Sequence, residues 1–210
     1  MSNIEFRQIQ LNLNAPVGPL NDVRRTRIMD AIGEGFTPQP VPIAGAMALV
    51  NPVTREAVFL NENQIQYTCD GLPAQFSPAR TEHLLGAVRD TLLLDDRFPM
   101  ILQVIAHQDA NGSAFERTVE AFTPIPPNTL RSYFPGLRGL GLRITFEELP
   151  YICDLRIEPL FSDPAYFFIQ FNAGSQQTAQ SIGTIVDDVA NWLNRLQGEL
   201  NDVIQEILGA

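Results

Sequence analysis

The sequence predicts an α+β protein in which antiparallel meander sheets are packed by helices. Three observations support this prediction. Short apolar runs separated by turn residues recur in both halves of the chain, which is typical of antiparallel strands. Each group of runs is followed by a segment with apolar residues at steps of three and four, the spacing of a helix. The last of these segments, Ile182–Ile207, predicts one long C-terminal amphipathic helix that closes the chain.

The first half begins with a strand over Ile4–Leu13. Its apolar alternation changes phase partway along, which predicts a bulge near Arg7 and Gln8. A helix with weak apolar spacing is expected next, over Leu20–Ile32. Three short strands then form a meander, over Ala46–Val50, Ala57–Leu60 and Gln64–Cys69. A helix follows from Ser77, since a capping hydroxyl precedes a proline at the first helical position.

The second half opens with a strongly apolar strand over Phe98–Ala106. Ala114–Phe122 is interpreted as its hairpin partner, with a short helix as the alternative. A helical turn is expected over Thr129–Phe134. Three further strands are predicted before the terminal helix, over Leu140–Phe146, Tyr151–Ile157 and Tyr166–Phe171.

The two halves, residues 1–97 and 98–210, follow the same order: strand, helical segment, three-strand meander and helix. This order favours a single α+β domain over residues 1–210 that is pseudo-duplicated. The two meanders could form two sheets, or one broad sheet with helices on one face.

The overall order of elements, and the way Tyr151–Phe171 leads into a terminal helix striped with Ile, Trp and Leu, resembles a sporadically distributed group of bacterial proteins. Those proteins are of about this size and of unknown function. The resemblance covers most of the chain in pattern. It implies the same fold class and brings no known activity.

Composition restricts the partners. The formal net charge of −10 repels phosphate backbones and anionic lipid surfaces, so neither nucleic acid nor a membrane is expected as a partner. The N-terminal residues lack a basic region followed by an apolar run, so a signal peptide is not expected. A cytoplasmic location follows as the default, and there Cys69 and Cys153 are expected to be reduced thiols.

The chain contains no lysine, because all 14 cationic residues are arginine. Schiff-base and pyridoxal-phosphate enzymes need a lysine amine, and P-loop nucleotidases and protein kinases need a phosphate-binding lysine. These mechanisms are therefore excluded within this chain.

Few residues suggest a reaction. His107 and Asp109 would point to one face of a strand and could orient an imidazole or begin a metal site, although a strand-end turn is the favoured explanation. A catalytic metal usually needs three protein ligands, and the spacing offers no third. The two cysteines are expected to be buried and apolar. We therefore predict no catalytic residue, no metal site and no cofactor.

The apolar stripe of the terminal helix is the candidate interface. Its burial against the protein's own sheet is the alternative, but the helix is longer than a strand could cover, and a two-fold partner is the commonest cover for such an excess. The stripe residues are Ile185, Val189, Trp192, Leu196, Leu200 and Val203. The first hypothesis is thus a non-enzymatic module that forms a homodimer or binds a partner protein.

A small-molecule binder or enzyme is the second hypothesis. Aromatic residues are frequent in the last strands and could line a pocket between the sheet and the terminal helix. Phe168 is the candidate lining residue, and Arg143 and Arg156 are the candidate anchors for an anionic ligand.

Overall fold

The computed structural model describes residues 4–175 and 178–208, and within them the chain has the predicted α+β fold. The elements of the first half are β1 (Glu5–Asn14), α1 (Asp22–Ile32), β2 (Thr37–Gln39), β3 (Met47–Asn51), β4 (Glu56–Asn61), β5 (Gln64–Asp70) and α2 (Pro78–Leu92). Those of the second half are β6 (Arg97–Phe98), β7 (Met100–Asp109), α3 (Ala114–Phe122), α4 (Pro127–Tyr133), β8 (Leu142–Glu148), β9 (Tyr151–Pro159), β10 (Tyr166–Gly174), β11 (Gln180–Ser181), α5 (Ile182–Gln197) and α6 (Glu199–Leu208).

One broad antiparallel sheet, the main sheet, contains both meanders. Over the described residues it has nine strands in the order β2-β3-β4-β5-β1-β7-β10-β9-β8. The first strands of the two halves, β1 and β7, pair at its centre, with Gln10 opposite Gln103. Each meander extends outward from that centre, so that β3 and β8 occupy corresponding positions in the two halves. β6 and β11 form a separate two-stranded ladder.

The predicted bulge in the first strand is confirmed. The register of β1 against β7 shifts between Phe6 and Gln8, as the change of phase in the sequence indicates. After the bulge Ile9, Leu11 and Leu13 all point into the core and are fully buried. The bulge thus lets both ends of a long strand contribute apolar side chains to one face.

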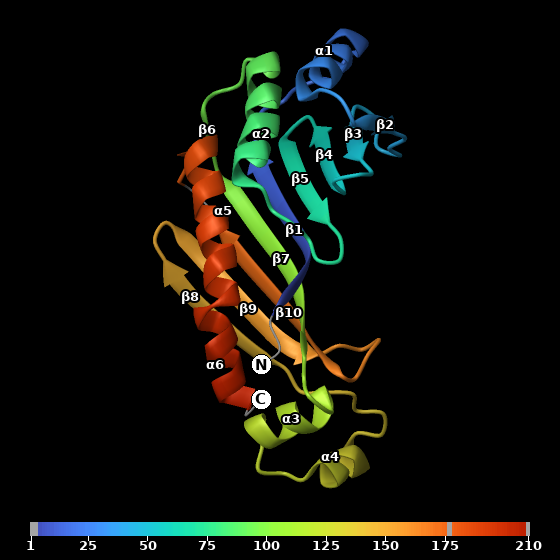
Figure 1. The fold of residues 1–210 in the computed structure, drawn as a ribbon, viewed down its shortest axis with the longest axis vertical. Helices are drawn as coiled ribbons and strands as arrows, with labels where there is room; N and C mark the ends of the chain where they lie inside the picture. Colours follow the sequence, from blue (N-terminus) through green and yellow to red (C-terminus); the bar gives the residue numbers. More distant parts are fainter. Residues whose placement is uncertain (1–3, 176–177, 209–210) are drawn as a thin grey trace.

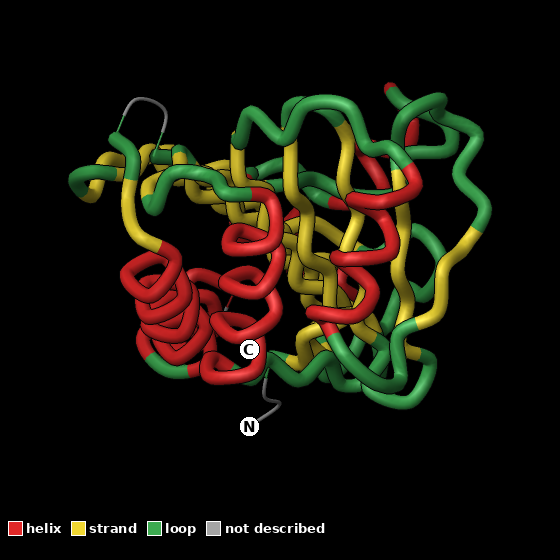
Figure 2. Tube along the Cα trace, turned by 90° about the horizontal axis from the view of Figure 1, so that it is seen from above, coloured by secondary structure: helices red, strands yellow, loops and turns green. Residues whose placement is uncertain are grey.

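The helices α2 and α5 lie side by side over one face of the main sheet, with α1 against α2 and α6 after α5 (Figure 1). Figure 2, which looks along the long axis, shows this helical layer on one side of the strands. The core fills the space between the two layers. At its centre the Trp192 ring of α5 lies 4.9 Å from the Phe171 ring of β10.

The segment Ala114–Phe122 is a helix, α3, so its interpretation as a hairpin strand is wrong and the short-helix alternative is correct. Ser113 is the N-cap, and its side chain accepts a hydrogen bond from the backbone N–H of Glu116. A capping serine with glutamate three residues later is a common helix start. Phe115 and Val119 form the buried side of this helix, which lies against β9 and α6.

The C-terminal helix is present as α5, but its predicted continuity to Ile207 is wrong, because α5 and α6 are separated at Gly198. The backbone there has φ −98° and ψ −97°, which is not helical. Glycine is the residue that most readily leaves a helix, apart from proline. Asp202 still donates its N–H to the Gly198 carbonyl at 3.2 Å, and α6 continues on from α5 in Figure 1.

The opposite side of the main sheet, the polar face, is lined mainly by amides. Strand alternation places them there because their neighbours in sequence are buried toward the helices. The central members are Gln8, Gln10 and Asn12 of β1, Gln64 and Gln66 of β5, Gln103 of β7, and Gln170 and Asn172 of β10. Many of these amides form hydrogen bonds with each other. For example, the Gln64 side chain donates a hydrogen bond to Asn12 Oδ1 at 2.7 Å.

Candidate functional site

The stripe of the terminal helix packs inside the chain's own core. The stripe residues Ile185, Val189, Trp192 and Leu196 are all buried. Trp192 contacts aromatic rings of β10 and β8, with Phe146 of β8 at 6.1 Å between ring centroids. These four side chains therefore attach α5 to the main sheet, which is the alternative that the sequence left open. The side chains of Leu200 and Val203 lie outside what the structure describes.

The three candidate ligand-binding residues do not meet between the sheet and α5. Arg143, Arg156 and Phe168 all belong to the polar face, since their strand neighbours point toward the helices. Arg143 forms a bidentate ion pair with Asp154, through Nε at 2.8 Å and a second guanidinium nitrogen at 3.0 Å. Arg156 Nε lies 3.8 Å from the same carboxylate. The expected pocket is therefore not built by these residues.

His107 and Asp109 share the polar face, at the end of β7. The carboxylate of Asp109 accepts the N–H of Asn111 at 2.7 Å and so closes the turn after the strand. Partial burial, with the nearby Arg7 charge, lowers the pKa of His107. Across the described residues, no three His, Cys, Asp or Glu side chains are grouped so as to hold a metal ion.

Both cysteines are free and buried, on the helix-facing side of the sheet. The thiol of Cys69 donates a hydrogen bond to the Gln75 carbonyl at 3.1 Å. Burial raises the pKa of Cys69, and it raises the pKa of Cys153 to about 11. Because the thiolate is the reactive form, neither cysteine is placed to act as a nucleophile.

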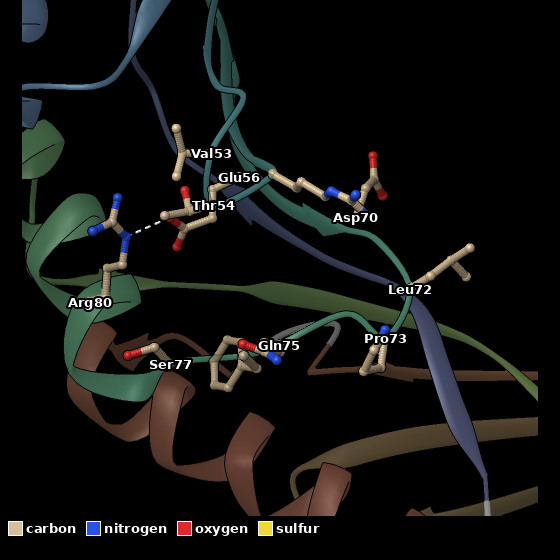
Figure 3. Close-up of a pocket in the computed structure, with 11 residues that line it drawn as sticks. Val53, Thr54, Glu56, Asp70, Leu72, Pro73, Gln75, Ser77 and Arg80 are labelled. Atoms are coloured by element: carbon tan, nitrogen blue, oxygen red, sulfur yellow. Dashed lines mark hydrogen bonds and ion pairs between the residues drawn. The ribbon is translucent and has the colours of Figure 1, made fainter.

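A surface cleft of about 480 Å³ lies between the turn that joins β3 to β4 and the loop that leads into α2. Figure 3 shows Arg80 extending from the first turns of α2 toward Glu56 at the start of β4, and Leu72 and Pro73 on the other side of the cleft. Glu56 is only 3% exposed, although it is an acidic residue. Burying a carboxyl group is costly unless it is paired and hydrogen-bonded, so the partners of Glu56 must account for its burial.

Two donors satisfy the Glu56 carboxylate. Arg80 donates its Nε–H to Oε2 at 2.5 Å, and the Tyr67 hydroxyl donates to Oε1 at 2.9 Å. Burial raises the pKa of Tyr67, so its hydroxyl keeps the proton that it donates. The carboxylate thus joins β4, β5 and α2, and it is already engaged by both partners. This arrangement stabilises the wall of the cleft and does not resemble a free acid or base.

The outer edge of β8 is the second candidate site. β8 has seven residues and ends the strand order of the main sheet. Its Leu142, Ile144 and Phe146 point toward the helices but are only half-buried, where they pack against the edge of the core. Its Arg143, Thr145 and Glu147 are exposed on the polar face. β8 therefore offers backbone donors and acceptors beside an incompletely covered apolar row.

The other edge of the sheet is different in kind. β2 has three residues, all exposed, and the central one is Pro38. Short edge strands and prolines are common means of preventing a sheet from pairing with another chain. Of the two edges, only that of β8 has the length and apolar content that strand pairing requires.

Sequence reasoning named Arg143 only as an anchor for an anionic ligand, and it did not find the other principal residues of either site. Glu56, Tyr67 and Arg80 come from three elements, and no spacing in the chain connects them. The edge position of Thr145 depends on the strand order, which the sequence left open between one sheet and two. The sequence did contain one signal of an edge strand, which is the alternation of charged and apolar residues in the segment that includes Arg143 and Glu147.

No helix within the described part of the chain combines the length and the apolar character that crossing a lipid bilayer requires. In comparisons with known proteins, neither a protein-family model nor a curated protein matches the chain.

Proposed function

We propose that the protein is a non-enzymatic module that binds protein, and in the first place its own copies, through the β8 edge of the main sheet. The observation that carries the proposal is the half-covered apolar row of Leu142, Ile144 and Phe146 on a seven-residue edge strand. A strand added to this edge would satisfy the backbone groups of β8 and cover that row at the same time.

The contrast with the other edge supports this choice. β2 is short, exposed and interrupted by proline, whereas β8 has no proline between its ends. The burial of the α5 stripe supports it as well. Trp192 and Leu196 are occupied within the chain, so the association expected from the sequence needs a different surface.

The test is sedimentation velocity from about 1 to 200 μM, a range that spans affinities typical of weak dimers. Wild-type protein is expected to convert from monomer to dimer as its concentration rises. A clean monomer throughout the range contradicts the proposal.

Thr145→Arg is the variant that isolates the β8 edge. Thr145 is exposed and lies directly opposite Asp154 of β9, so an arginine there is favourable within one chain. When two copies pair through this edge, the added arginines lie close together on the polar face, and their like charges should oppose the pairing. Thr37→Arg, at an exposed threonine of β2, is the matched control and should leave association unchanged. Equal association of both variants and wild type excludes the β8 edge.

A further inference from the structure

We propose that the partner at the β8 edge is a second copy of this chain, paired antiparallel and centred on Thr145, with Arg143 of each copy opposite Glu147 of the partner subunit. This inference rests on the proposed function and deepens it, because it specifies the partner, the register and the residues that select them.

Geometry leaves few registers. Two identical strands that pair antiparallel are related by a two-fold axis perpendicular to the sheet. Residues directly opposite each other point to the same face, so the axis must pass beside a residue that faces its own copy. Any such register keeps the helices of both copies on one side and the polar faces on the other.

The charged residues of β8 select the residue at the centre of the pairing. With Thr145 opposite Thr145 of the partner subunit, each Arg143 faces a glutamate, and this happens twice because of the symmetry. Among the described residues Glu147 has no ion-pair partner within the chain, and it is exposed. Centring on Ile144 would place Arg143 opposite a threonine. Centring on Phe146 would place Glu147 opposite a threonine, so neither of those registers pairs the charges.

The same centre brings two of the three apolar residues of each copy together on the helix side, with Leu142 opposite Glu148 of the partner subunit. Ile144 then lies opposite Phe146 of the partner subunit, so two half-buried residues from each copy meet. Trp192 lies behind Phe146, with 6.1 Å between the ring centroids, so the new contact would extend the existing core. Pairs of aromatic and β-branched side chains are among the favourable cross-strand pairs.

Arg143 would be shared between two carboxylates in this dimer. Its bidentate ion pair is with Asp154 of the inner neighbour β9, while 60% of the Arg143 side chain remains exposed. A second carboxylate at the edge can share the guanidinium, since its five N–H donors exceed the two that Asp154 takes.

Exchanging the two charges provides the test. Arg143→Glu places glutamate opposite glutamate in a homodimer, and Glu147→Arg places arginine opposite arginine. Each variant alone is expected to weaken self-association at least about tenfold, because two favourable pairs become two repulsive ones. An equimolar mixture is expected to recover wild-type affinity, since every glutamate of one variant then meets an arginine of the other.

Arg27→Glu is the matched control. Arg27 is an exposed arginine of α1, away from the β8 edge, and the substitution makes the same change of charge. The dimer of this variant should form as in wild type. Circular dichroism and the unfolding midpoint establish that each variant is folded before the association is measured.

The outcomes separate this inference from the proposed function. Recovery in the mixture, with loss in each variant alone, supports the register. If wild type dimerises and Thr145→Arg prevents it, but the charge variants dimerise as wild type does, the β8 edge stands and this register is overturned. A mixture that associates no better than its components also overturns the register. If wild type is a monomer at all concentrations, both proposals fail.

Discussion

Replacing Leu196 by alanine tests whether the stripe of α5 is core or interface. Leu196 is 1% exposed and belongs to the continuous core beneath the helices. The substitution removes three buried carbons, worth about 2.4 kcal/mol at about 0.8 kcal/mol each. Its neighbour Trp192 is held between the rings of Phe146 and Phe171, so the cavity will not close fully. We therefore expect a loss of about 3 kcal/mol in the free energy of unfolding.

The assay is urea unfolding followed by tryptophan fluorescence. Trp192 is the only tryptophan of the chain, so its emission reports on this part of the core. Asn191→Ala, at an exposed position of the same helix, is the control, and its effect should stay within about 0.7 kcal/mol. The stability lost in Leu196→Ala should be the same at low and high protein concentration.

Two results would refute this reasoning. One is an unchanged midpoint for Leu196→Ala, which would mean that the side chain is not packed. The other is a loss of stability that appears only at high protein concentration, which would mean that the stripe is an interface, as the sequence suggested.

Three further predictions concern single side chains. Glu56→Ala leaves the buried Tyr67 hydroxyl without its acceptor and should cost about 2–3 kcal/mol in chemical denaturation, whereas Glu82→Ala on the exposed side of α2 should change little. Burial raises the pKa of Cys153 to about 11, so a thiol reagent at pH 8 should label it only after unfolding, and rapid labelling of native protein would contradict its burial. The pKa of His107 is lowered in the folded state, so the unfolded state binds more protons near pH 6. The contribution of His107 to the free energy of unfolding should therefore be complete above about pH 6.5 and should fall as the pH drops below that value. His107→Gln should reduce this part of the decline.

Local features of the fold could be predicted from the sequence because they depend on neighbouring residues. The bulge between Phe6 and Gln8 follows from a change of phase in one strand. The helix after Ser77 begins as the Ser-Pro pair indicates, although the Ser77 side chain makes no capping hydrogen bond. The helix after Ser113 was missed as a first choice, since nine residues with mixed polarity fit a strand nearly as well.

The functional surfaces depend on distant residues, and these could not be predicted. Whether a strand is central or at an edge is decided by the pairing of segments about a hundred residues apart, as between β1 and β7. The contacts of Glu56 with Tyr67 and Arg80 likewise require β4, β5 and α2 to meet. The terminal segment is longer than one strand could cover, which suggested that part of its apolar face is exposed. The break at Gly198 and the width of the main sheet accommodate much of this extra length.

The correspondence between β3 and β8 gives the short strand β2 a consequence for how far assembly proceeds. A sheet with two equally adhesive edges would add copies without limit and form fibres. β2 covers the edge of β3, the counterpart of β8, with three exposed residues, one of which is a proline. Growth that begins at β8 would therefore end after two copies, and removing the β2 segment is the change most apt to convert a finite particle into a polymer.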